Sequence, residues 1–99
     1  MSLFPNLATT TGFQILSAFS TATKLTVPPG ATYALFSVET NAVRYRSDTT
    51  APTASIGVYL PVSTGTPGLL FQLSGGDVLN NVQFIPVTGS ATINIEYYK

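Results

Sequence analysis

Two arginines stand one residue apart in the segment VRYRSD, and together they are half of the four basic residues in the chain. They are Arg44 and Arg46, and Asp48 follows two residues later. An arginine fork can donate parallel hydrogen bonds to a carboxylate or bind a carbonyl oxygen. One interpretation is a local ion pair, in which Asp48 or Glu39 neutralises an arginine. The other is an anchor that binds a carboxylate or carbonyl oxygen of a neighbouring subunit, and both alternatives stay open.

The residues needed for catalysis are scarce. The chain of 99 residues has no histidine and no cysteine. It therefore lacks the usual general base near neutral pH, the commonest metal ligand and any disulfide. The four acidic residues are scattered along the chain as Glu39, Asp48, Asp77 and Glu96. We expect a protein that is not an enzyme, and we assign no catalytic residue, no cofactor and no metal site.

One glycine-rich segment could suggest a cation or phosphate loop. Gly75-Gly76-Asp77 is similar to the start of a calcium-binding repeat or a phosphate loop, but no Lys-Ser or Lys-Thr pair follows it. A calcium site needs several carboxylates together, and this chain has few. We expect a turn in which glycine adopts a positive φ.

The composition narrows the classes of partner. Charged residues make up 8% of the chain and the formal net charge is zero. Nucleic-acid binding needs clustered Lys and Arg, so no nucleic-acid partner is expected. No run approaches the roughly 20 apolar residues of a transmembrane helix, and the N-terminus has no signal-peptide pattern, so we expect no membrane partner and synthesis in the cytoplasm. A surface with so little charge favours association with protein.

The chain reads as one all-β domain. Period-two alternation between turn residues recurs, whereas helical patterns are nearly absent. Strands are expected over residues 13–19, 23–27, 32–39, 42–47, 56–62, 69–74, 82–87 and 91–98. About seven or eight short antiparallel strands at intervals of about ten residues predict a β-sandwich or small barrel.

The two strands beside the arginines are expected to form a hairpin. Thr40-Asn41 would be its two-residue turn, because Asn tolerates a positive φ. Val38 would then pair with Val43, and both would face the core. Glu39 and Arg44 would be diagonal neighbours on the outer face.

Residues 1–12 are expected to form an extended arm that precedes a domain of residues 13–99. The arm carries the apolar residues Leu3, Phe4 and Leu7. Apolar side chains on a loose tail need a partner. The arm either folds back onto its own domain or docks on a neighbouring subunit.

The segment GATYALFSVETNAVRYRSDTTAPTASIGVYLPV, with the ending NNVQFIPVTGSATINIEYYK, resembles a group of small tailed-bacteriophage proteins. Their pattern is a Pro-Gly-Ala turn, a strand, a Val-Arg-(Tyr/Trp)-Arg-Asp-Asp-Gly-Thr-x-Pro-Thr-Ala run and a terminal Tyr-Tyr. The resemblance covers about residues 28–99. The residues that match the central run are Arg44, Tyr45, Arg46, Asp48 and Pro52, whereas Ser47 departs from it.

The resemblance implies a virion structural protein with a β-sandwich or jelly-roll-like domain. Its expected role is capsid decoration, or cement: a homo-oligomer, a trimer, that binds the major capsid protein on the outside of the head. An alternative within the virion is a tail or fibre component that binds the host surface. An alternative from another class is a small enzyme or carbohydrate-binding domain unrelated to a virus. The residues expected at a protein interface are Leu3, Phe4, Leu7, Arg44, Arg46, Asp48 and Tyr98.

Overall fold

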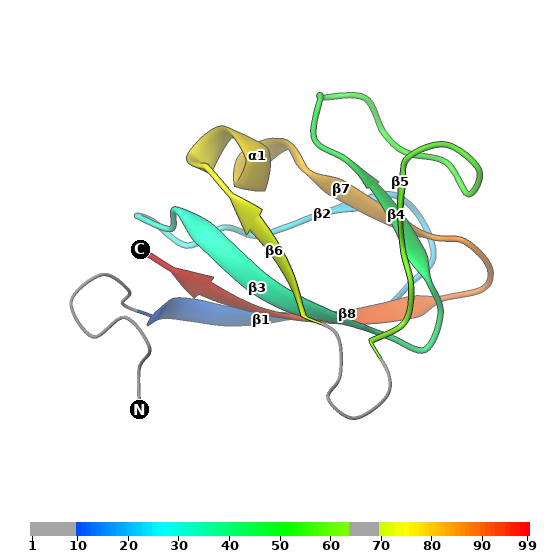
Figure 1. The fold of residues 1–99 in the computed structure, drawn as a ribbon, viewed down its shortest axis with the longest axis horizontal. Helices are drawn as coiled ribbons and strands as arrows, with labels where there is room; N and C mark the ends of the chain where they lie inside the picture. Colours follow the sequence, from blue (N-terminus) through cyan, green and yellow to red (C-terminus); the bar gives the residue numbers. More distant parts are fainter. Residues whose placement is uncertain (1–9, 64–69) are drawn as a thin grey trace.

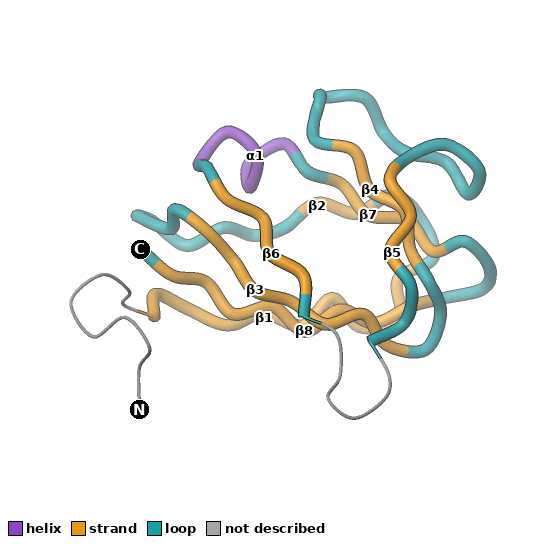
Figure 2. Tube along the Cα trace, in the orientation of Figure 1, coloured by secondary structure: helices purple, strands orange, loops and turns teal. Residues whose placement is uncertain are grey.

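The computed structural model describes residues 10–63 and 70–99, which form two four-stranded antiparallel sheets and one short helix (Figure 1). The elements are β1 (Thr10–Phe19), β2 (Thr23–Lys24), β3 (Tyr33–Glu39), β4 (Val43–Arg46), β5 (Val58–Leu60), β6 (Phe71–Ser74), α1 (Gly76–Asn81), β7 (Gln83–Pro86) and β8 (Ala91–Tyr98). Sheet A has the order β1-β8-β3-β6, and sheet B has the order β2-β7-β4-β5. The two sheets form two layers joined by loops (Figure 2).

The strand order defines the topology. The pairs β1–β8, β2–β7, β3–β6 and β4–β5 are all antiparallel and nest inside one another along the chain. Except for β4 and β5, consecutive strands lie in different sheets. This is the arrangement of a jelly roll, in which a long paired ribbon is rolled into two sheets. The predicted all-β sandwich is confirmed, with eight strands in the described residues.

Period-two alternation on β8 builds the centre of the core. Ile93 and Ile95 are fully buried and Tyr97 is nearly so, whereas the residues between them point outward. Phe84 of β7 faces them from sheet B and meets the ring of Phe36 edge-on, with centroids 5.3 Å apart. Each side chain of this size stabilises the fold by about 1.5–3 kcal/mol when it leaves water. The core therefore holds the two sheets together through large side chains from both layers.

The predicted hairpin between residues 32–39 and 42–47 is wrong. β3 pairs with β8 and β6 in sheet A, whereas β4 pairs with β7 and β5 in sheet B. Val38 and Val43 are both fully buried, as expected, but they face the core from opposite sheets. The chain passes from sheet A to sheet B at Thr40 and Asn41. Thr40 has a φ of 78°, and the side-chain amide of Asn41 donates to the carbonyl oxygen of Ser90 at 2.7 Å.

The glycine-rich segment also differs from its predicted turn. Gly75 has the expected positive φ, 101°, but Gly76 and Asp77 begin the helix α1. Leu79 of this helix is fully buried and contributes to the core between the sheets. Six residues make fewer than two helical turns, so they are too few to show a period of 3.6 in the sequence.

The expected boundary between arm and domain falls inside a strand. Thr10 pairs with Tyr98 and Gly12 pairs with Tyr97, so residues 10–12 belong to β1. The three apolar residues assigned to the arm, Leu3, Phe4 and Leu7, lie outside the described residues.

Candidate functional site

Arg44 ties the strand β4 to the loop that leads into β5. Its Nε donates to the carbonyl oxygen of Ala54 at 3.1 Å, and its Nη1 donates to the carbonyl oxygen of Gly57 at 3.0 Å. The guanidinium carbon lies 5.4 Å from the centroid of the Tyr59 ring, within range of a cation–π contact. Two of the five N–H donors of the half-buried Arg44 are thus engaged within its own chain.

Gly57 makes this contact possible. Its φ is 138°, and a Cβ at this position would lie 3.0 Å from the carbonyl oxygen of Tyr45 and 3.1 Å from the Cβ of Arg44. A side chain would therefore meet β4 and also favour a different backbone conformation. The glycine lets the loop approach β4 closely enough for its carbonyl oxygen to reach the guanidinium group.

Arg46 forms the local ion pair that was one of the two sequence interpretations. Its Nε donates to Oδ1 of Asp48 at 3.0 Å, and its Nη2 donates to Oδ2 at 2.5 Å. The hydrogen bond from Arg46 lowers the pKa of the Asp48 carboxyl, and the same bond raises the pKa of Arg46. Glu39 and Arg44 lie in different sheets, so their predicted contact is wrong.

An open depression lies beside this ion pair. Its volume is about 390 Å³, and its lining includes Arg46, Asp48 and the apolar residues Ile56 and Val58. Both apolar side chains are more than half exposed. A shallow surface with apolar walls and one ion pair is suited to contact with another protein.

The outer face of sheet A presents a second surface, which includes the predicted interface residue Tyr98. Tyr98 stacks on Tyr33 with ring centroids 5.0 Å apart and an interplanar angle of 11°. Its hydroxyl donates to Oε1 of Glu96 at 2.5 Å. This hydrogen bond, helped by desolvation, raises the pKa of Tyr98 to about 12. The stacked pair is a rigid aromatic surface, of the kind that protein interfaces favour.

Sequence reasoning did not assign the exposed apolar residues on β1. Phe13 is 62% exposed and Ile15 is 53% exposed, whereas Leu16 and Phe19 are buried. Phe13 lies beside Glu96, and Ile15 lies beside Asn94, on the outer face of sheet A. Alternation was visible in this segment, but both of its faces carry large apolar residues, so the pattern did not show which face is exposed.

The four carboxylates of the chain are separated. Asp48 pairs with Arg46, whereas Glu39 accepts from Asn94 and Glu96 accepts from Tyr98. Among residues 10–63 and 70–99, no group of three or more metal-binding side chains comes together. The helix in the described part of the chain is too short to cross a membrane.

No protein-family model, curated protein or solved structure matches this chain. The observations that bear on function are therefore the sequence pattern, the jelly-roll topology and the two surfaces described above.

Proposed function

We propose that this protein is a bacteriophage capsid decoration protein. In this role a homo-oligomer, a trimer, binds the outside of the head and bridges adjacent major capsid subunits. The protein is made in the host cytoplasm and works on the surface of the virion. Its action is adhesive: each contact is weak, and many copies together stabilise the shell.

The exposed strand β1 is the observation that carries this proposal. β1 is one of the two edge strands of sheet A and spans ten residues without one charged side chain. Soluble proteins usually protect an edge strand with charges, proline or a bulge. Here the pairing with β8 is irregular at both ends of β1, between Thr10 and Gly12 and between Leu16 and Phe19, but the regular stretch between them has no such feature, and its residues Phe13 and Ile15 are exposed. The middle of this edge carries neither charge nor proline, so its backbone groups are suited to strand addition by a second protein.

The topology and the sequence pattern support the same class. Eight-stranded jelly rolls occur in viral capsid proteins, lectins and cupins, so the fold alone does not select one function. The Val-Arg-Tyr-Arg run on β4 and the Tyr-Tyr at the end of β8 belong to the pattern over residues 28–99 that resembles bacteriophage proteins. Together, the fold and the sequence pattern favour a capsid-associated protein over a lectin or a cupin.

The copy number of the protein in purified particles tests the proposal. Quantitative mass spectrometry against the major capsid protein should give a number comparable to that protein. A handful of copies per particle would instead indicate a tail, fibre or vertex component. Absence from particles would exclude a virion protein.

A second experiment tests the role expected of the arm. Deletion of residues 1–9 removes no residue of β1, so the remaining chain should fold. The shortened protein should no longer bind to capsids that were purified without the wild-type protein. The matched variant L3S/F4S/L7S keeps the length of the chain and should lose binding to the same degree. Unchanged binding by both variants would overturn the role of the arm, while the proposal for β1 would stand.

A further inference from the structure

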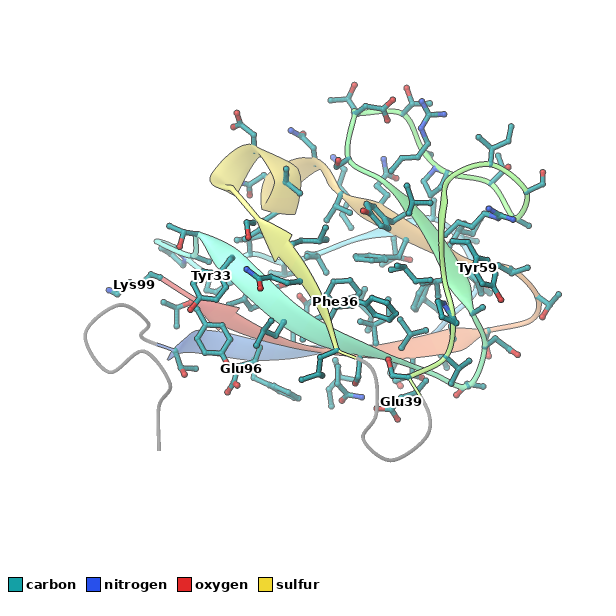
Figure 3. The ribbon with its side chains drawn as sticks, in the orientation of Figure 1. Tyr33, Phe36, Glu39, Tyr59, Glu96 and Lys99 are labelled. Carbon is teal, nitrogen blue, oxygen red and sulfur yellow. The ribbon has the colours of Figure 1, made fainter. Side chains whose placement is uncertain are left out.

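Six of the eight charged residues of the chain are divided between the two outer faces, whereas Asp77 lies in α1 and Lys99 follows β8. Glu39 and Glu96 alternate with the buried residues of β3 and β8, so both project from the outer face of sheet A (Figure 3). Lys24, Arg44 and Arg46 project in the same way from sheet B, where they flank Gln83 and Ile85. With Asp48 next to Arg46, sheet B carries a net charge of two positive and sheet A two negative. A chain of zero net charge therefore has two faces of opposite sign.

No ion pair among the described residues neutralises the charges on sheet A. Glu39 and Glu96 accept hydrogen bonds from neutral groups, the amide of Asn94 and the hydroxyl of Tyr98. Arg46–Asp48 is the one ion pair within residues 10–63 and 70–99, and all four carboxylates of the chain lie in these ranges. Arg44 binds carbonyl oxygens, which leave its positive charge in place.

Both faces also carry exposed apolar surface beside the charges. On sheet A it is Phe13 and Ile15, and on sheet B it is Tyr59, which is 51% exposed and lies under Arg44. A complementary pair of faces with apolar centres meets the requirements of a specific protein interface.

We propose that copies of this protein associate through unlike faces, with the outer face of sheet A of one copy packed on the outer face of sheet B of the next. Pairing of two like faces is opposed because it brings charges of the same sign together. Contacts between unlike faces form a closed ring if the rotation closes and an open filament if it does not. This inference rests on the proposed function only for the presence of a homo-oligomer, and it is tested without capsids.

Sedimentation velocity of the purified full-length chain tests the inference, over a concentration series at low and high NaCl. The wild type should self-associate at low salt, with an apparent Kd at least tenfold weaker at high salt because salt screens the interface. A wild type that stays monomeric at low salt, or associates equally at both salts, would overturn the inference. A monomeric wild type would also contradict the homo-oligomer in the proposed function, whereas binding to the capsid is tested separately by the copy number in particles.

Charge-reversal variants distinguish loss of this interface from loss of the folded structure. E39K/E96K makes both faces positive, and K24E/R46E makes both faces negative, so neither variant should associate alone. An equimolar mixture of the two should regain association, because each then presents a face complementary to the other. D77K, in α1 and away from both faces, changes one charge by the same amount and should associate like the wild type. A mixture that remains monomeric, with each variant folded by circular dichroism, would contradict the inference.

Discussion

The guanidinium of Arg44 donates to the carbonyl oxygen of Gly57 across 3.0 Å, so the loop before β5 is fastened to the outer face of β4. A second hydrogen bond, from Nε of Arg44 to the carbonyl oxygen of Ala54, holds the same loop three residues before Gly57. Arg44 thus organises the candidate surface from within its own chain. This arrangement differs from an anchor whose fork points only toward a partner.

Replacing Arg44 by lysine should therefore reduce stability. The ammonium group keeps the charge but cannot reach two carbonyl oxygens in the geometry of the planar fork. Hydrogen bonds to charged groups contribute about 1.5–3 kcal/mol each, so we expect R44K to lower the free energy of unfolding by about 2 kcal/mol. Urea denaturation measures the loss. R46K is the control and should change stability far less, because the Arg46–Asp48 pair is exposed.

Alanine at Gly57 should be more damaging than alanine at another glycine. The new Cβ would lie 3.0 Å from a backbone oxygen, and the φ of 138° is one that alanine rarely adopts. Strained backbone of this kind costs about 1–3 kcal/mol. G76A is the control, since no atom lies within 4 Å of the new Cβ and alanine favours the helix α1. Thermal unfolding should shift downward for G57A and upward or not at all for G76A.

The aromatic centre of the core should dominate stability. Phe84 is fully buried and packs against the rings of Phe36 and Tyr45. F84A should lower the free energy of unfolding by about 3–5 kcal/mol, through lost burial and the cavity left behind. I85A changes the next residue on the outward face of β7 and should cost much less. Equal losses in the two variants, measured by urea denaturation, would contradict the assignment of the inward face.

Alkaline pH should destabilise the protein through Tyr97. This residue is 1% exposed, and burial raises the pKa of its hydroxyl from 10.0 to about 12. Its stabilising contribution is complete below pH 10 and is lost as the pH rises toward 12, because only the unfolded chain ionises in that window. The free energy of unfolding should fall there by about 1.4 kcal/mol per pH unit from this hydroxyl.

The variant Y97F should remove that contribution and leave a shallower pH dependence between pH 10 and 12. Urea denaturation of both proteins at several pH values across the window measures the difference, in which the titration of other groups cancels. Identical slopes would show that the hydroxyl of Tyr97 does not remain protonated in the fold.

The positions of the strands could be predicted because alternation is a local property. On β8 the alternation of Ile93, Ile95 and Tyr97 with polar residues specified both the strand and its buried face. On β4 it correctly placed Arg44 and Arg46 on the outer face, opposite the buried Val43. The Arg46–Asp48 pair could be predicted because only Ser47 separates its members in the sequence.

The pairing of the strands could not be predicted in the same way. Val38 and Val43 would be buried equally well in a hairpin or in two facing sheets, so their pattern fits both arrangements. Gly57 binds Arg44 through a backbone carbonyl oxygen, which every residue possesses and which no sequence pattern marks. The divided charge of the two faces depends on the strand order, and it emerged only with the topology.

The place of β8 in sheet A has a consequence for synthesis. β8 follows all the other described strands in the chain, yet it lies between β1 and β3 in the sheet. While residues 91–98 are still inside the ribosome, β1 has no neighbour to pair with and β3 has only β6. We expect the nascent chain to remain unfolded until translation passes this strand, with its apolar segments available to chaperones throughout.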